Sequence, residues 1–80
     1  MSALYAALGA LVRERRKALG VSLRDLSAAC ALSKGYLSEL ENSRQRAPTI
    51  ATIAAIASAL NTTAHALLME AYERGLRETR

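Results

Sequence analysis

Apolar residues recur along this chain at the three- and four-residue spacing of amphipathic helices, and no stretch shows the strict alternation of a half-buried strand. Gly20 ends the first of these stretches, and Asn61 suits the left-handed conformation that ends the fourth. Serines and threonines that can act as helix N-caps precede the other stretches: Ser22, Ser33, Thr49 and Thr63. The sequence therefore predicts an all-α fold with helices over residues 3–19, 23–30, 34–42, 50–60 and 64–76.

Two of these helices carry well-defined apolar faces. The face of the first helix is formed by Leu4, Leu8, Leu11, Val12 and Leu19. The face of the fourth helix is formed by Ile50, Ile53, Ile56, Ala57 and Leu60. Cys30 is interpreted as a small apolar residue at a helix–helix contact, with a redox-sensing thiol as the alternative.

Residues 22–42 carry the most informative pattern, because they read as two short helices joined by a tight turn. Ser22 caps the first helix, and Asp25 occupies its third position, where a carboxylate can answer the free amides of the first turn. The pattern breaks at residues 31–32 and restarts after Ser33. Two helices this short cannot each bury a face alone, so they pack together and project the outer face of the second. A projected helix of this kind is suited to entering a groove.

Length and composition limit the class of protein. The 80 residues make one domain, near the lower size limit for folding without a metal or disulfides. The single cysteine excludes an internal disulfide, so hydrophobic packing must hold the core. We interpret residues 1–80 as one domain in which residues 69–80 form a helical extension used for dimerisation. The one histidine, the one cysteine and the few carboxylates show no metal or catalytic spacing, so we expect no enzyme activity, metal, cofactor or small-molecule ligand.

The chain is basic, with a formal charge of +4 and a pI near 9.8. Residues 1–48 hold eight Lys and Arg against four Asp and Glu, whereas residues 49–80 hold three of each. The whole excess therefore lies in the half with the helix pair, which favours a face that attracts a polyanion. No apolar run approaches the roughly 18 residues of a membrane span, and residues 1–11 lack the basic start of a secretory leader. We therefore expect no membrane partner and a cytoplasmic location.

The spacing of these residues resembles the Cro/phage-repressor type of helix-turn-helix, also called the XRE-like family. The resemblance runs from about Leu8 to Leu68 and rests on Leu8-Gly9, Val12, Arg16, Gly20-Val21-Ser22, Leu26, Leu32-Ser33, Leu37-Ser38, Leu40-Glu41, Pro48 and Leu60. It implies a five-helix, lambda-repressor-like DNA-binding domain whose second and third helices form the helix-turn-helix. It also implies a transcriptional regulator that binds double-stranded DNA.

Two positions depart from the family pattern. Leu23 replaces a glutamine that usually contacts phosphate, and the neighbouring Arg24 is the candidate replacement for that contact. Ala31 replaces the usual glycine of the turn, where a positive φ costs another residue about 1–2 kcal/mol. We expect the fold to tolerate this residue at some expense in stability.

The family pattern also pairs Arg16, near the end of the first helix, with Glu41, at the end of the third. The residues agree with this, because Glu41 follows Leu40 on a face that must turn inward and a buried carboxylate needs a fixed cation. We therefore predict a structural ion pair between Arg16 and Glu41 rather than a DNA contact by Arg16.

In the docking geometry of this family, the N-terminal end of the third helix enters the major groove. Lys34 can donate to guanine O6 and N7, Glu39 can accept from cytosine N4, and Gly35 lets the backbone approach the bases. The residues expected to read bases are Lys34, Gly35, Ser38 and Glu39. Those expected to contact phosphate, which fixes register without reading sequence, are Arg24, Ser33, Tyr36, Ser38, Asn42, Arg44 and Arg46. Three cations of the first helix are interpreted instead as a solvated face: Arg13, Arg15 and Lys17.

One such domain buries too little surface for tight specific binding, so we expect a homodimer on a palindromic operator with half-sites about one helical turn apart. The candidate interface is an apolar stripe on the fifth helix formed by Leu68, Met69, Tyr72 and Leu76, with Glu73, Arg74 and Arg77 as its rim. In the alternative arrangement this stripe folds back on the first helix, where Leu4 and Tyr5 lie.

Two classes of function fit these residues. The leading hypothesis is a bacterial or phage transcriptional regulator, such as a small repressor, that acts by occupying an operator. The alternative is a protein-interaction module, such as an antitoxin or adaptor, that uses the same fold to bind another protein. Gly35 and Glu39 favour the alternative, because neither is a strong nucleic-acid contact.

Overall fold

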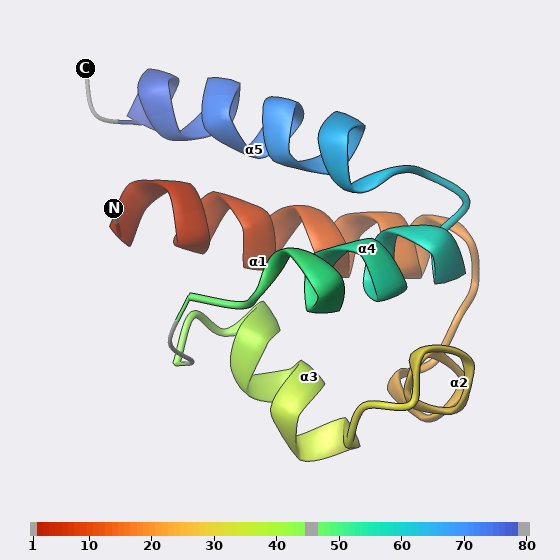
Figure 1. Cartoon of the computed structure of the whole chain (residues 1–80). Coiled ribbons are helices and arrows are strands. Elements are labelled where there is room, and N and C mark those ends of the chain that lie inside the picture. Colours follow the sequence, from red (N-terminus) through yellow and green to blue (C-terminus); the bar gives the residue numbers. More distant parts are fainter. Residues whose placement is uncertain (1, 45–46, 79–80) are drawn as a thin grey trace.

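The computed structural model describes residues 2–44 and 47–78, which form five helices and no strand. The helices are α1 (Ser2–Ala18), α2 (Leu23–Cys30), α3 (Lys34–Glu41), α4 (Ile50–Ala59) and α5 (Ala64–Glu78). Figure 1 shows α1 and α5 side by side and running in opposite directions, with α2 and α3 on the other side of α1. The predicted all-α fold is therefore confirmed.

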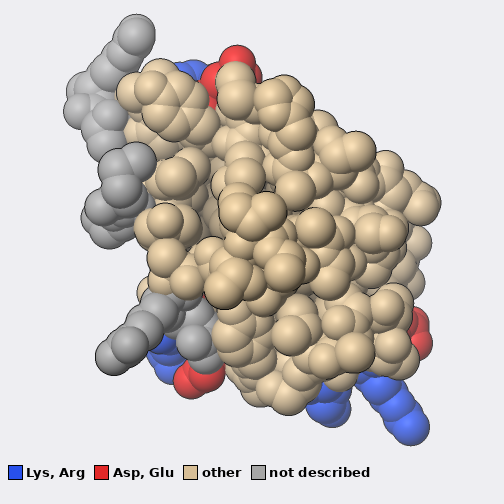
Figure 2. Space-filling model, viewed as in Figure 1, with Lys and Arg blue, Asp and Glu red and all other residues tan. Residues whose placement is uncertain are grey.

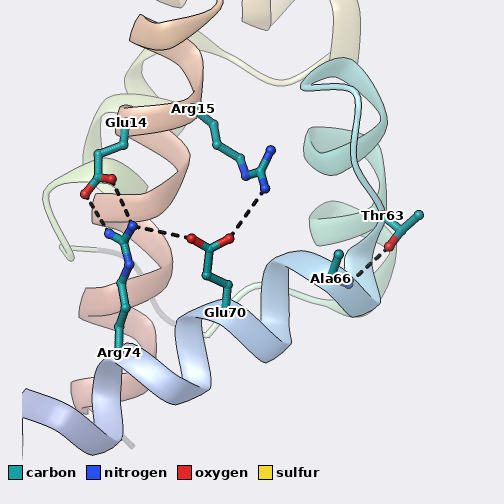
Figure 3. Close-up of polar contacts among 6 residues, drawn as sticks. All are labelled: Glu14, Arg15, Thr63, Ala66, Glu70 and Arg74. Atoms are coloured by element: carbon teal, nitrogen blue, oxygen red, sulfur yellow. Dashed lines mark hydrogen bonds and ion pairs between the residues drawn. The ribbon is translucent and has the colours of Figure 1, made fainter.

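Serine and threonine side chains cap the N-terminal ends of four of the helices. The hydroxyl oxygens accept hydrogen bonds from backbone amides three residues later, at 3.0 to 3.1 Å: Ser22 from Asp25, Ser33 from Tyr36, Thr49 from Thr52 and Thr63 from Ala66 (Figure 3 draws the last of these). Each bond satisfies one amide that the helix itself leaves unpaired. All four predicted N-caps are confirmed.

Residues with a left-handed backbone follow four of the helices: Gly20 (φ 71°), Ala31 (φ 58°), Ser43 (φ 60°) and Asn61 (φ 60°). After α1, α3 and α4 the chain closes with paired backward hydrogen bonds that satisfy the last carbonyls, as in the Schellman motif. The ends at Gly20 and Asn61 and the positive φ of Ala31 are confirmed. The sequence did not predict the turn at Ser43, because serine rarely adopts this conformation.

The core lies between the helices and is made mainly of leucine, isoleucine and alanine, including Leu8, Leu11, Leu26, Leu37, Ile56, Leu60 and Leu67, each at most 2% exposed. Cys30 packs against this core, and its thiol donates to the Leu26 carbonyl at 3.0 Å. The prediction that Leu19 and Ile50 belong to buried apolar faces is wrong, because they are 47% and 66% exposed. Helix α1 ends at Ala18, so Leu19 lies outside it. Ile50 is the first residue of α4 and precedes the part of this helix that packs on the core.

Within the described ranges, no single helix combines the length and apolar composition needed to cross a membrane. Helices α4 and α5 meet that criterion only as a pair, and the pair is bent by 101°. The same residues contain no group of three or more His, Cys, Asp and Glu side chains placed to hold a metal ion.

Candidate nucleic-acid interface

Helix α3 packs its inner face on α1 and α2 and presents its outer face to solvent. Leu37 and Leu40 are 0% and 5% exposed, which fixes the inner face. The outer face carries the residues expected to read bases, of which Lys34, Gly35 and Glu39 are exposed and Ser38 is half-buried. The structure therefore places these four residues on one accessible helix.

The N-terminal end of α3 is open to solvent. Ser33, Lys34 and Gly35 are all exposed, and the first amides of a helix have no carbonyl partner within it. Tyr36, one residue further on, is half-buried and packs against the core. This end of α3 therefore combines unpaired amides, a lysine and a partial positive charge, which together favour an anion.

The C-terminal end of α3 is held by local hydrogen bonds. The Asn42 side-chain amide donates to the Ser38 carbonyl at 2.8 Å, so part of this expected phosphate contact already serves the helix end. The Arg44 amide donates to the Glu39 carbonyl at 2.8 Å, while the Arg44 side chain is exposed. Arg46, the remaining expected phosphate contact of this loop, lies outside the described residues.

An ion pair fixes α3 against α1. Arg16 donates from Nε to Glu41 Oε2 at 2.8 Å and from Nη2 to Glu41 Oε1 at 3.2 Å, and the two side chains are only 11% and 3% exposed. Arg16 Nη1 also donates to the Val21 carbonyl at 2.9 Å, a contact that the sequence did not predict. The hydrogen bonds to Glu41 raise the pKa of the Arg16 guanidinium, although burial acts in the opposite direction. Arg16 is thus turned into the fold, as the sequence predicted, and away from solvent.

The turn between α2 and α3 depends on a residue that sequence reasoning missed. The Ser27 hydroxyl, on α2, donates to the Leu32 carbonyl in the turn. Next to this contact Ala31 adopts its left-handed backbone, which is unfavourable for a residue with a Cβ. A serine five residues before a turn carbonyl is a weak sequence signal, because most helical serines simply face solvent.

Pairing with carboxylates separates the cations into two groups. Arg15, Arg16 and Arg74 each contact a glutamate. Among the residues that the structure describes, the cations without a carboxylate partner are Arg13, Lys17, Arg24, Lys34, Arg44 and Arg77. Figure 2 shows Lys and Arg side chains at the lower edge, beneath α2 and α3, and an uncharged surface over α4. The sequence explains the uncharged surface, because residues 47–69 contain no Lys, Arg, Asp or Glu.

A second set of ion pairs joins α1 to α5 (Figure 3). Arg74 donates to both oxygens of Glu14, at 2.6 and 2.9 Å, and to Glu70 at 3.5 Å. Arg15 donates to the other oxygen of Glu70 at 3.4 Å. The hydrogen bond from Arg74 lowers the pKa of Glu14. Two sequence interpretations are therefore wrong: Arg15 is not simply solvated, and Arg74 faces α1 instead of rimming the apolar stripe.

The apolar stripe of α5 borders the face of the helix that packs on the rest of the protein. Met69, Tyr72 and Leu76 are 46%, 47% and 45% exposed, whereas Leu68 is partly buried against the core. Gly75 of α5 faces α1, where a Cβ placed on it would be 3.4 Å from Ala3. Helix α5 therefore does fold along α1, as the alternative arrangement required, but three of its four stripe residues stay exposed.

A family model described as helix-turn-helix, HTH_3, matches residues 12–67, which include the whole α2–α3 pair and both residues of the buried ion pair. The chain belongs to this helix-turn-helix family. The resemblance to the XRE-like type is confirmed.

Curated relatives of this chain are named as transcriptional regulators. The chain is 32% identical over 66 residues to the HTH-type transcriptional regulator SinR of Bacillus subtilis, covering 82% of this chain and 60% of SinR. It is 36% identical over 73 residues to the transcriptional regulator ClgR of Mycobacterium tuberculosis, covering 91% of this chain and 64% of ClgR. The chain therefore spans about three fifths of the length of these relatives. They are transcriptional regulators and not enzymes, as expected here.

Solved structures agree on the fold. The clp gene regulator ClgR from Corynebacterium glutamicum superposes with a TM-score of 0.85 at 37% identity, covering 95% of this chain and 80% of that chain. SinR, in a structure of its complex with the SinI protein, superposes with a TM-score of 0.74 at 32% identity, covering 82% of this chain and 64% of that chain. The arrangement of the five helices is thus that of known helix-turn-helix regulators.

Proposed function

We propose that this chain is the sequence-specific DNA-binding part of a transcriptional regulator, with α3 in the major groove of a palindromic operator. The observation that carries the proposal is the open N-terminal end of α3, where Lys34 stands exposed without a carboxylate partner among the described residues. Helix-turn-helix proteins read base edges with this end of their second helix. Because its partner is DNA, we place this activity in the cytoplasm.

In this proposal Lys34 and Glu39 read bases, Ser38 assists, and Gly35 allows close approach of the backbone. Lys34 occupies the first helical position, so its long side chain extends ahead of the helix. A lysine donates to guanine O6 and N7, and a carboxylate accepts from cytosine N4. The absence of a side chain at Gly35 keeps the neighbouring backbone within reach of the groove.

Phosphate contacts in this proposal come from the two ends of the helix pair. Arg24 on α2 and Arg44 after α3 are exposed cations without a carboxylate partner among the described residues. Ser33, Tyr36, Asn42 and Arg46 complete the proposed set. Such contacts fix the protein on the duplex and do not distinguish sequences.

We further propose that two copies associate through α5. Met69, Tyr72 and Leu76 form an exposed apolar stripe, and Leu68 borders it from the core side. Exposed apolar groups gathered on one helix face are typical of an association surface. A twofold dimer would present two copies of α3 to the two half-sites of a palindrome.

Selection of binding sites from random duplex DNA tests the proposal directly. We expect a palindrome with a central spacer, bound by two copies. Lys34→Ala should relax preference at one base position, whereas Arg44→Ala should weaken all sequences similarly and lower the salt slope by about one. Arg13→Ala, which removes an equal charge from an exposed residue of α1, is the matched control and should leave base preference unchanged. Enrichment of no sequence by the wild-type chain would contradict the proposal.

A second candidate function is a protein-interaction module. The exposed stripe of α5 favours it, because the same surface can accept a different protein in place of a second copy. The SinR structure, which contains SinI, shows that a relative of this fold forms a complex with another protein. Sedimentation of the chain with and without DNA separates the two functions: a monomer that shifts no duplex at low salt favours the interaction module.

A further inference from the structure

Helices α1 and α5 meet through small residues. Ala7 and Ala71 are 1% and 0% exposed, and a Cβ added to Gly75 would lie 3.4 Å from the backbone of Ala3, an ordinary van der Waals distance. Small side chains let two helices approach, but they form shallow ridges that resist sliding less than large interlocking ones do. Leu8 of α1 and Leu67 of α5 are also buried in the core, so apolar packing holds α5 in place, and polar contacts at its edge can define its tilt.

The ion-pair network of Figure 3 supplies these polar contacts. Arg74 binds both oxygens of Glu14 through two hydrogen bonds, at 2.6 and 2.9 Å. A bidentate pair of this kind fixes the relative orientation of the two side chains as well as the distance between them. One oxygen of Glu70 accepts a hydrogen bond from Arg74 at 3.5 Å, and the other accepts one from Arg15 at 3.4 Å. Glu70 and Arg74 lie one turn apart on α5, whereas Glu14 and Arg15 are neighbours on α1, so two points along α5 are tied to one turn of α1 and the network restrains the rotation of α5.

The other side of α1 is joined firmly to the reading helix. Arg16 and Glu41 form the buried pair, and the backbone of α3 lies against Gly9 of α1. Helix α1 thus links α3 on one side to α5 on the other. Any change in the tilt of α5 on α1 changes the position of α3 relative to a partner that is attached through α5.

We propose that Glu14, Arg15, Glu70 and Arg74 are positioning residues that set the separation of the two reading helices in the dimer and thereby select the spacing of the operator half-sites. This inference rests on the proposed dimer through α5. It assigns to a partly exposed network a role in specificity beyond the modest contribution that such ion pairs make to the free energy of unfolding.

The size of the effect follows from the dimensions of the molecule. Its shorter extents are 22 Å, so a tilt of about 5° in α5 moves the far side of the protomer by about 2 Å. Two protomers double this displacement, to roughly the 3.4 Å rise of one base pair. One base pair also turns a half-site by about 35° around the DNA axis, so a protomer held less firmly on α5 accepts a neighbouring spacing at a lower cost.

The test compares operators with identical half-sites whose central spacer is correct, one base pair shorter or one base pair longer. Dissociation constants are measured for the wild-type chain, Arg74→Gln and Glu14→Gln. Arg13→Gln is the control, because it removes the same charge as Arg74→Gln from an exposed residue of α1 that has no ion pair among the described residues. Thermal unfolding of each variant checks that the fold is kept.

We expect Arg74→Gln and Glu14→Gln to reduce discrimination between correct and altered spacers by about threefold or more, with base preference inside each half-site unchanged. Arg13→Gln should keep the wild-type ratio. Retention of that ratio by both network variants, or an equal loss in Arg13→Gln, would overturn the inference and leave the proposed function standing. Failure of the wild-type chain to bind a palindrome as a dimer would instead overturn the proposed function, and this inference with it.

Discussion

Gly9 of α1 lies directly against the carbonyl oxygen of Leu40 in α3. A Cβ added to Gly9 would overlap that oxygen and would also come within 3.2 Å of the Glu41 carbonyl oxygen. The obstacle is backbone, which cannot turn aside as a flexible side chain can. The absence of a side chain at residue 9 therefore sets how closely α3 approaches α1.

Gly9→Ala is expected to destabilise the fold by about 1–3 kcal/mol, because α3 must move away from α1 to make room for the methyl group. The helix propensity of alanine, which alone would favour the variant by about 1 kcal/mol, is too small to offset this displacement. Urea unfolding measures the change. A variant at least as stable as the wild-type chain would show that α1 and α3 are further apart than described.

Gly35→Ala is the counterpart on the same pair of helices, because no atom lies within 4 Å of a Cβ placed there. We expect the variant to be more stable by about 0.5–1 kcal/mol, since alanine favours a helix more than glycine does. Under the proposed function its affinity for the selected operator should fall, because the methyl group enters the space between helix and bases. Urea unfolding and operator titration on one preparation test both parts, and increased stability with unchanged affinity would remove Gly35 from the base-reading set.

Arg16→Met is expected to cost about 3–5 kcal/mol, because it leaves the Glu41 carboxylate buried without its cation. Glu41→Leu alone should also destabilise the fold, because it leaves the Arg16 guanidinium buried without its carboxylate. The double variant Arg16→Met/Glu41→Leu should lose clearly less than the sum, since it leaves no unpaired charge. Urea unfolding of all four chains gives the coupling, and additive losses would show that the two residues act independently.

Ala31→Gly is expected to raise the melting temperature. The left-handed backbone of Ala31 costs about 1–2 kcal/mol that glycine does not incur, against about 0.5–1 kcal/mol for the greater chain freedom of glycine. A net gain of about 0.5 kcal/mol corresponds to a few degrees in a domain of this size. Ala29→Gly, at an exposed helical position of α2, is the control and should lower the melting temperature.

The Glu14–Arg74 pair predicts a dependence of stability on acid. Because Arg74 lowers the pKa of Glu14 in the folded chain below the ordinary value of 4.5, Glu14 stabilises the fold above that pH. The contribution is lost as the pH falls from 4.5 through the lower folded pKa. NMR titration of the Glu14 carboxyl should show a midpoint below 4.5 that rises in Arg74→Gln. An unchanged midpoint in the variant would mean that another group lowers the pKa.

Much of the candidate interface could be predicted from the sequence because it is built from local patterns. The caps at Ser22 and Ser33 act over three residues, and the apolar spacing around Leu26 and Leu37 fixes which faces turn inward. The Arg16–Glu41 pair required the family resemblance as well, since its partners are 25 residues apart. Ser27 and the side-chain bond of Asn42 were missed because short polar residues at helix ends have several possible partners.

The sequence by itself determined the five helices, four of their N-caps and the exposed outer face of α3, because backbone hydrogen bonds and apolar periodicity act over a few neighbouring residues. Only the tertiary structure decided that Arg15 and Arg74 are paired as well. Glu14 and Arg74 are 60 residues apart and Arg15 and Glu70 are 55 apart, and they meet because α1 and α5 pack in opposite directions. The close approach of Gly9 to Leu40 likewise depends on how two helices cross. Contacts of this kind follow from the relative placement of whole helices, which no local pattern specifies.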